Sequence, residues 1–188
     1  MNLLSDPDEN CVDGMQSSNV ALRERAFQIM MNKWHKVIYH FLRTMLGNHD
    51  DAADATQETF IQVLKSIHGF RRESKFSTWL FTIARRKALD SIRSNKRWSS
   101  MESLNEHNHI KSVLQNDIYF EGSEIEAMLQ AAILTLPERQ REIFILRYFD
   151  EISFAELSQI LGISEGASKA SYFHAKQKIA RFVELNAE

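Results

Sequence analysis

Apolar residues recur at intervals of three to five along most of the chain, which is the spacing of one face of an α-helix. The longest such stripe starts near Ser18 and consists of Leu22, Phe27, Met30, Trp34, Val37, Phe41 and Met45. It stops at Gly47, and a glycine in this position commonly ends a helix. Strand-like alternation is weak, and the chain has only 6 glycines and 2 prolines. The pattern therefore predicts an all-α protein.

Two further helical stripes follow in the same half of the chain. The first starts near Asp50 or Asp51, ends at Gly69, and is expected to bury Phe60, Ile61, Val63, Leu64 and Ile67. A polar loop from Gly69 to Ser77 comes next. The second stripe follows the loop and is expected to bury Leu80, Ile83, Ala84, Ala88 and Ile92. Three helices with these stripes predict a compact bundle over residues 17–98.

Two segments lack a helical period. Residues 1–16 are acidic and polar, and we expect them to be disordered. They contain neither a basic start nor a long apolar run, so they do not predict a signal peptide. Residues 99–122 are rich in Asn, His, Ser and acidic residues, with Lys111 as their lone base. This composition predicts an acidic linker between two halves that can move independently.

Three capping boxes mark helix starts in the C-terminal half. The S/T-x-x-E pattern begins at Ser123, Thr135 and Ser153, and its side chains satisfy the free N–H groups of a first helical turn. The boxes predict helices at about 124–134, 137–149 and 153–161 within a second domain, residues 123–188. A turn at 162–164, with Ser164 as the N-cap, then leads to a last helix that ends near Val183.

The end of the chain has the helix-turn-helix pattern of a short helix, a glycine turn and a second helix. In such a motif the second helix lies in the major groove of DNA. Tyr172, Ala175 and Ile179 are spaced to face the protein core. This leaves for DNA the residues Ala167, Lys169, Ser171, His174 and Lys178. A plain helical hairpin is the alternative.

Charge is distributed unevenly along a chain whose formal net charge is only −2. Between residues 71 and 97, two acids (Glu73 and Asp90) oppose nine bases, which are Arg71, Arg72, Lys75, Arg85, Arg86, Lys87, Arg93, Lys96 and Arg97. Such a local excess favours a polyanionic partner, with a solvated helix face as the alternative. The phenylalanines at the ends of the loop, Phe70 and Phe76, could either stack on unpaired bases or pack under the loop.

The opposite charge gathers on the second helix. Asp51, Asp54 and Glu58 lie three and four residues apart, so they share one face. This face could bind a metal, cap the helix or meet a basic partner. Because no Glu-x-x-His pair completes a metal site, we expect capping plus a partner surface, and no metal or cofactor.

The single cysteine, Cys11, excludes an internal disulfide and suits a reducing compartment. As a lone thiol it could alternatively sense oxidants. No apolar run approaches the roughly 20 residues that a membrane-spanning helix needs. These features predict a cytoplasmic protein.

Several ordered motifs resemble those of the extracytoplasmic-function (ECF) sigma factors, the promoter-specificity subunits of bacterial RNA polymerase. DAADATQETF at 51–60, FSTWL with IAR at 76–85 and ALDSIR at 88–93 look like their region 2. LPERQRE at 136–142 and ISEG at 163–166, with the helix that follows, look like their region 4. The resemblance covers nearly everything from Ser18 to Phe182. It implies a sigma factor that binds core polymerase and promoter DNA, and it implies no enzyme activity and no cofactor.

The resemblance also implies three contact surfaces. The clamp helices of the polymerase β′ subunit would contact Asp51, Asp54, Gln57 and Glu58. Single-stranded DNA of the minus-ten element and its melted junction would contact Arg71, Arg72, Ser74, Lys75, Phe76, Trp79, Arg85, Arg86, Arg93, Lys96 and Arg97. With this domain on the β flap, the duplex minus-thirty-five element would contact Ser164, Glu165, Ala167, Ser168, Lys169, Ser171, His174 and Lys178.

Family members are typically held inactive by an anti-sigma factor, and in the family the acidic linker threads toward the RNA exit channel. The chain departs from the family pattern at a few positions. Arg86 stands where Asn is frequent, Ala167 and Ser168 replace a common Thr-Val, and Ser171 and His174 stand where arginines are frequent. Arginine side chains make the most common specific hydrogen bonds to guanine bases. Because two candidate arginines are missing here, we do not predict which minus-thirty-five sequence the protein recognises.

Two other functions compete with this interpretation. A helix-turn-helix regulator that binds DNA without polymerase would need a dimer and a palindromic site, and it would leave the stretch from Asp51 to Trp98 without a role. A metal-dependent nuclease could use His49, Asp50, Asp51 and Asp54, but it lacks a second element that bears ligands.

Overall fold

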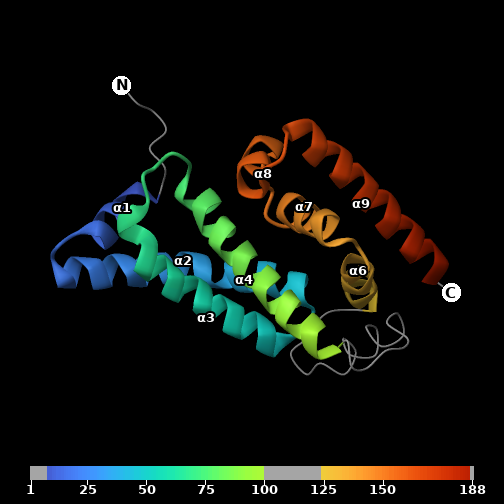
Figure 1. Cartoon of the computed structure of the whole chain (residues 1–188), viewed down its shortest axis with the longest axis horizontal. Coiled ribbons are helices and arrows are strands. Elements are labelled where there is room, and N and C mark those ends of the chain that lie inside the picture. Colours follow the sequence, from blue (N-terminus) through green and yellow to red (C-terminus); the bar gives the residue numbers. More distant parts are fainter. Residues whose placement is uncertain (1–7, 100–123, 187–188) are drawn as a thin grey trace.

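The computed structural model describes residues 8–99 and 124–186, and Figure 1 shows their arrangement. These residues form α-helices and one short 3-10 helix, with no strand among them. The all-α prediction is therefore confirmed. The predicted linker at 99–122 and the capping-box residue Ser123 lie outside the described residues, apart from Ser99, which ends a helix.

The N-terminal unit contains α1 (Glu9–Gln16), α2 (Val20–Leu46), α3 (His49–Ser66), η1 (Ile67–Gly69) and α4 (Phe76–Ser99). The Asn19 side chain accepts hydrogen bonds from two N–H groups in the first turn of α2. Gly47 ends α2 with a φ of 84°, a left-handed conformation that favours glycine. Asn48 then caps α3 through the Asp51 N–H. The predicted boundary between these two helices is confirmed.

Aromatic side chains fill the centre of this unit. Phe41 of α2 and Phe81 of α4 are almost completely buried, and their rings meet edge to face at 5.5 Å. Trp34 packs against Phe81 at 6.3 Å. Most of the predicted stripes are buried, but Leu22 is 53% exposed and Ile61 and Leu64 are each 43% exposed. The last two lie on a side of α3 that borders an open groove.

The prediction of disorder at the N-terminus is wrong for residues 9–16, which form α1. Val12 and Met15 of this helix are buried in the core. The preceding residue, Asp8, is only 2% exposed, and its Oδ1 receives hydrogen bonds from Lys33 Nζ at 2.7 Å and Trp34 Nε1 at 3.3 Å. Contacts with α2 therefore order a segment whose own composition is polar.

The C-terminal unit contains α6 (Glu124–Leu134), α7 (Glu138–Tyr148), α8 (Phe154–Leu161) and α9 (Glu165–Asn186). The capping box that starts α8 is complete, with Ser153 and Glu156 each bonded to the other's backbone N–H. The predicted box at Thr135 is wrong, because the Thr135 hydroxyl donates to the Ala132 carbonyl at the end of α6. Pro137, whose φ is fixed by its ring, instead precedes the first residue of α7.

The two units pack against each other, with α6 and α7 against α2, and α8 against α4 (Figure 1). The last turn of α2 has backbone carbonyls without helical partners. Gln130 of α6 donates to the Thr44 carbonyl and Arg141 of α7 to the Met45 carbonyl, both at 3.0 Å. A Cβ atom on Gly47 would lie 2.9 Å from a methyl group of Leu134. The C-terminal unit thus caps the end of α2.

Within residues 8–99 and 124–186, no helix combines the length and the apolar content needed to cross a bilayer.

Candidate polymerase and nucleic-acid interfaces

The acidic residues of α3 lie where the helix meets α4. Asp51 is half-buried and accepts a hydrogen bond from Asn48 Nδ2 at 2.6 Å, while Asp54 and Glu58 are exposed. Glu58 Oε2 forms an ion pair with Lys87 Nζ of α4 at 2.9 Å. A polar cleft beside these side chains also includes Asp90. The side chain that caps α3 is Asn48, and Asp51 accepts a hydrogen bond from it, while Asp54 and Glu58 are exposed on the helix surface.

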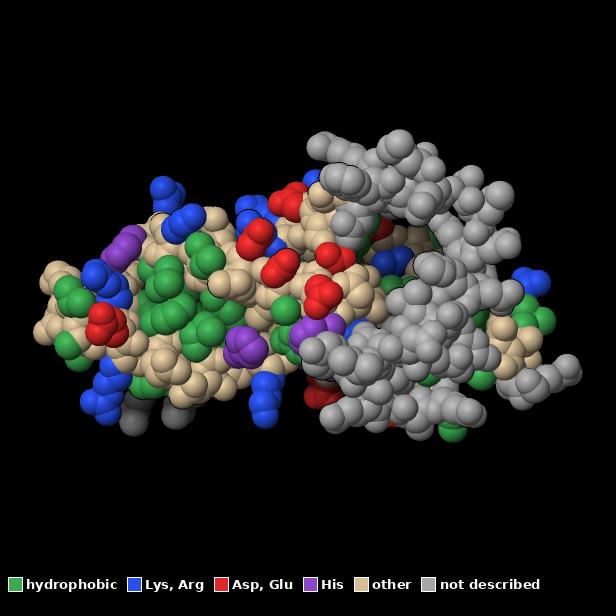
Figure 2. Space-filling view, turned by 90° about the horizontal axis from the view of Figure 1, so that it is seen from below, with side chains coloured by type: hydrophobic (Ala, Val, Ile, Leu, Met, Phe, Trp, Pro, Cys, Tyr) green, Lys and Arg blue, Asp and Glu red, His purple; other side chains and the backbone are tan. Residues whose placement is uncertain are grey.

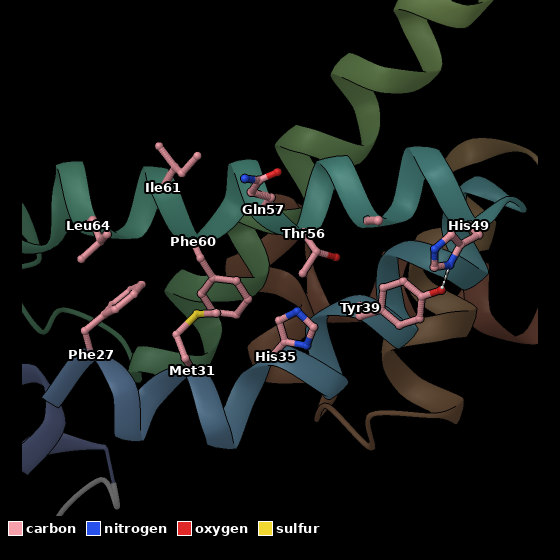
Figure 3. Close-up of a pocket in the computed structure, with 11 residues that line it drawn as sticks. Phe27, Met31, His35, Tyr39, His49, Thr56, Gln57, Phe60, Ile61 and Leu64 are labelled. Atoms are coloured by element: carbon pink, nitrogen blue, oxygen red, sulfur yellow. Dashed lines mark hydrogen bonds between the residues drawn. The ribbon is translucent and has the colours of Figure 1, made fainter. Parts of the chain in front are cut away.

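An apolar groove runs beside this acidic face, between α2 and α3 (Figure 3). Its volume is about 720 Å³, and its lining consists of Phe27, Met31, His35, Tyr39, His49, Ala53, Thr56, Gln57, Phe60, Ile61 and Leu64. At one end, the Tyr39 hydroxyl and His49 Nδ1 share a hydrogen bond of 2.7 Å. Figure 2 shows apolar side chains gathered on one face of the molecule, next to a group of acidic ones.

The sequence interpretation missed this groove because it assigned Ile61 and Leu64 to the core. The spacing contains a signal that could have found it. Ile61 and Leu64 follow Gln57 by four and seven residues, so all three lie on one face of α3. The predicted polymerase-binding residue Gln57 therefore lines the groove together with two exposed apolar side chains.

The loop between η1 and α4 is exposed at its basic residues. Arg71, Arg72 and Lys75 are exposed and Ser74 is half-buried. Arg72 has a φ of 60°, which is uncommon for a residue other than glycine. Its guanidinium group forms an ion pair with Asp13 of α1.

The aromatic residues of the loop pack beneath it. Phe70 is 8% exposed and Phe76 only 1% exposed. Their ring centroids lie 5.0 Å and 5.8 Å, respectively, from that of the half-buried Trp79. Phe76 is therefore not available to stack on a base in this arrangement, and its contact with DNA stays a prediction. Trp79 keeps a partly exposed ring at the edge of the loop.

The basic face of α4 divides into two parts. Arg86 and Arg93 are exposed, and Arg93 Nη1 lies 3.5 Å from Asp90. Arg85 points instead toward the C-terminal unit, where its Nε lies 2.8 Å from Oε1 of the fully buried Glu142. In this arrangement Arg85 therefore contacts protein, and its DNA-binding role stays a prediction. The side chains of Lys96 and Arg97 lie outside the described residues.

Glu142 is the most deeply buried carboxyl group at the boundary between the units. Burial raises its pKa, and the Arg85 guanidinium opposes that rise. The contact between the two is an ion pair without a well-formed hydrogen bond. Removing one member of such a buried pair leaves the other charge without compensation.

A second ion pair joins the loop to the C-terminal unit. Lys75 Nζ lies 2.7 Å from Oε1 of Glu156, the residue that completes the capping box of α8. Burial acts to raise the pKa of Glu156, but hydrogen bonds from Lys75 and Ser153 hold it below its usual value. The loop lysine is thus held by the domain that carries the helix-turn-helix.

The helix-turn-helix presents most of its predicted DNA-binding residues to solvent. Its exposed members are Ser164, Glu165, Ala167, Lys169, His174 and Lys178. Ser164 caps α9 by accepting from the Ala167 N–H at 3.1 Å. Ser171 is half-buried. Ser168 is completely buried, with its hydroxyl 3.3 Å from the Ser164 carbonyl, and its contact with DNA stays a prediction.

The inward face of α9 agrees with the sequence. Ala175 and Ile179 are buried, and the half-buried Tyr172 ring lies 5.9 Å from both Phe144 and Phe154. These contacts fix α9 against α7 and α8 and turn its opposite face outward.

The described residues contain no group of three or more His, Cys, Asp or Glu side chains placed to hold a metal ion. Two candidates for a nuclease site make other contacts instead, His49 with Tyr39 and Asp51 with Asn48. Cys11 of α1 is half-buried. Burial and the nearby Asp8 raise the pKa of its thiol, which disfavours the reactive thiolate.

Comparison with known proteins identifies the family. The family descriptions of sigma-70 region 2 and sigma-70 region 4 match residues 30–98 and 126–179. The ECF RNA polymerase sigma factor SigW of Bacillus subtilis is 32% identical over 165 residues, which cover 83% of this chain and 88% of SigW. The chain belongs to the ECF sigma factors. SigM, an ECF sigma factor of the same organism, is 31% identical to this sigma factor over 158 residues, covering 83% and 91% of the two chains.

Solved structures share the fold of this sigma factor. The sigma factor RpoE of Bartonella quintana, in complex with the anti-sigma factor NepR, matches with a TM-score of 0.68 and 22% identity over 85% of this chain and 98% of RpoE. CnrH, in complex with the cytosolic domain of CnrY, matches with a TM-score of 0.70 and 19% identity over 95% of this chain and 97% of CnrH.

Proposed function

We propose that this ECF sigma factor binds core RNA polymerase and directs promoter-specific initiation of transcription in the cytoplasm. The observation that carries the proposal is its similarity to SigW, which extends over 88% of that sigma factor. The protein acts through binding free energy and catalyses no covalent step. We assign one binding surface to each of three elements. The acidic helix α3 would bind core polymerase, the basic loop the minus-ten element, and the helix-turn-helix the minus-thirty-five element.

The α3 face is the proposed contact for the clamp helices of the β′ subunit. Asp54 and Glu58 offer carboxylates to basic side chains, and Gln57 can hydrogen-bond beside them. Ile61 and Leu64 add apolar area that is exposed in this structure. An apolar groove with a polar edge is the surface that an amphipathic helix binds. The C-terminal unit is proposed to sit on the flap of the β subunit.

The loop and α4 are the proposed contacts for the minus-ten element. Extruding a base costs on the order of a few kcal/mol in lost stacking, and contacts that exist only with the extruded base can offset this cost. Loop residues Arg71, Ser74 and Lys75 are placed to select that base. Arg86 and Arg93 on α4 would contact phosphates, which adds affinity without base preference.

The first turns of α9 are the proposed contact for the duplex minus-thirty-five element. Ala167, Lys169 and His174 are all exposed, with Lys178 further along the helix. Lys169 also pairs with Glu165 at 2.6 Å, an exposed contact that a phosphate can replace.

Opening of the two units is part of the proposal. Lys75 and Arg85 are tied to Glu156 and Glu142 of the C-terminal unit, so both pairs must break before these bases can contact DNA. We also propose that an anti-sigma factor regulates the protein, since the sigma factor RpoE, which shares this fold, forms a complex with the anti-sigma factor NepR.

The first test is co-elution of the full chain with purified bacterial core polymerase, followed by transcription from candidate promoters. The wild-type chain should co-elute and start new transcripts. Replacing both groove residues, Ile61→Asp with Leu64→Asp, should weaken core binding about tenfold or more, because fully burying one such side chain is worth about 1.5–3 kcal/mol.

The matched control is Leu22→Asp, which changes an exposed leucine of α2 outside the groove. This variant should bind core polymerase as the wild type does. Equal losses in the groove variant and the control would show that the groove is not the contact. Failure of the wild-type chain to co-elute under any condition would contradict the proposed function itself.

A further inference from the structure

The N-terminal helix α1 lies directly against the base of the loop between η1 and α4 (Figure 1). Gln16, its last residue, donates hydrogen bonds from Nε2 to the Ile67 carbonyl at 2.8 Å and to the Phe70 carbonyl at 3.2 Å. Both carbonyls belong to the turn that begins the loop, and one side chain of α1 holds them together.

A second contact reaches the loop itself. The Arg72 guanidinium forms an ion pair with Asp13 and lies 3.4 Å from the Gln16 Oε1. Arg72 is the loop residue with a φ of 60°. A left-handed conformation costs free energy for a residue with a Cβ atom, and it persists where surrounding contacts fix it. Asp13 and Gln16 provide such contacts.

The helix that holds the loop is itself firmly attached to α2. A Cβ atom on Gly14 would lie 2.6 Å from the Ala26 Cβ, so the two helices cross at close range. Asp8, just before α1, is buried with its carboxylate bonded to Lys33 and Trp34. The loop therefore contacts a helix that is itself packed firmly against α2.

A small cleft of about 150 Å³ separates the helix from the loop. Glu9 and Val12 of α1 form one side, and Arg72, Ser74 and Lys75 are on the loop side. Any shift of α1 would change the shape of this cleft, which lies among the side chains that the proposed function assigns to base selection.

We propose that α1 positions the loop for recognition of the minus-ten element, so that Asp13 and Gln16 determine how strictly the loop selects a base. This inference rests on the proposed function, which places single-stranded DNA at the loop. Asp13 and Gln16 are positioning residues, because they act through Arg72 and the loop backbone. The helix lies outside the segment that matches sigma-70 region 2, which begins at residue 30.

The test measures base preference with the complete holoenzyme. Core polymerase carrying the full chain is incubated with a promoter library randomised over the minus-ten segment, and the DNA in open complexes is sequenced. Asp13→Ala and Gln16→Ala should each reduce the ratio between the preferred base and the others by up to roughly fivefold at one or more positions. Asn10→Ala, an exposed residue of α1 with no part in these contacts, should keep the wild-type ratios.

Two further variants separate positioning from general damage to the fold. Asp13→Glu keeps the carboxylate and should restore most of the preference. In a chain that already carries Arg72→Ala, Asp13→Ala should change the base ratios little further, because the ion pair through which Asp13 contacts the loop is already absent. Amide hydrogen exchange of residues 71–75 in the free chain should be faster in Asp13→Ala and Gln16→Ala than in the wild type.

Unchanged base ratios in both alanine variants would overturn the inference, and so would equal losses for every base or unchanged hydrogen exchange in the loop. If the wild-type chain binds core polymerase but the resulting holoenzyme prefers no minus-ten base, the proposed function of the loop fails and this inference falls with it. A wild-type preference that survives in both variants overturns the inference alone.

Discussion

Asp150, just after α7, has a carboxylate oxygen that is buried without a hydrogen-bond partner. Burial raises its pKa from 3.8 to about 7. A raised carboxyl pKa means that the folded state holds the proton more tightly than the unfolded chain. The stabilisation from Asp150 is therefore complete below pH 4, and it is lost as the pH rises through 7.

Replacing this residue by Asn should remove that dependence. At pH 8 we expect Asp150→Asn to be more stable than the wild type by about 1–3 kcal/mol, since it no longer buries an unpaired charge. The difference should shrink steadily below pH 7. Urea unfolding of both proteins between pH 4 and 8 measures it, and parallel curves would refute the assignment.

Single residues also show where the sequence is informative and where it is not. The periodicity correctly places Ala175 and Ile179 inside, because a helix with one covered face buries every third or fourth residue. The same reasoning fails for Ile61 and Leu64, since nothing in the described chain covers their face of α3. Ser168, four residues before Tyr172, lies on the same buried face of α9, although the family resemblance assigns it a contact with DNA. Local spacing predicts a face but does not say what covers it.

At the scale of elements, the start of α8 offers a direct test. Its capping box satisfies N–H groups that would otherwise lack partners. Ser153→Ala should lower the free energy of unfolding by about 1 kcal/mol, the usual cost of losing such a cap.

Ser158→Ala is the matched control, because its hydroxyl on the same helix bonds only to the Ala155 carbonyl one turn back. We expect a change within about 0.5 kcal/mol at this half-buried position, where the hydroxyl caps no helix. Thermal or urea unfolding measures both variants. Equal effects would show that the box contributes nothing beyond an ordinary surface serine.

Helix boundaries were largely predictable, and the two errors share a cause. The boundary at Gly47 and the box at Ser153 depend on local chemistry that the sequence contains. The helix α1 was missed because its ordering comes from Lys33 and Trp34, far along the chain. The Thr135 box matched the pattern, but Pro137 rather than Thr135 precedes the first residue of α7. Tertiary contacts and backbone restrictions overrode the local signal in both cases.

At the scale of the whole molecule, the ion pair of Arg85 and Glu142 joins the two units. Removing one partner of a buried ion pair costs about 3–5 kcal/mol. In Arg85→Ala, the Glu142 carboxylate loses its partner across the boundary, and separation of the units would let water reach it. We therefore expect this variant to be more open than the wild type at pH 8, with a larger radius of gyration in small-angle X-ray scattering.

Arg93→Ala is the matched control, since this arginine of the same helix has an exposed partner, Asp90, within its own unit. Its radius of gyration should equal that of the wild type. If both variants keep the radius of gyration of the wild type, the ion pair of Arg85 with Glu142 does not hold the two units together. Neither the ion pair nor the capping of α2 by Gln130 and Arg141 could be read from the sequence, because each joins residues more than fifty positions apart.

Lys75 already neutralises Glu156 when the units are together. In the proposed complex, contact of this lysine with DNA would exchange its ion pair with Glu156 for a contact with the polyanion, and ions released from the DNA would be offset by ions that return to Glu156. Each independent phosphate contact contributes roughly 0.7–0.9 to the slope of log affinity against log salt. A contact made by exchange contributes much less. The closed chain should thus respond to changes in cellular ionic strength more weakly than its count of basic residues suggests.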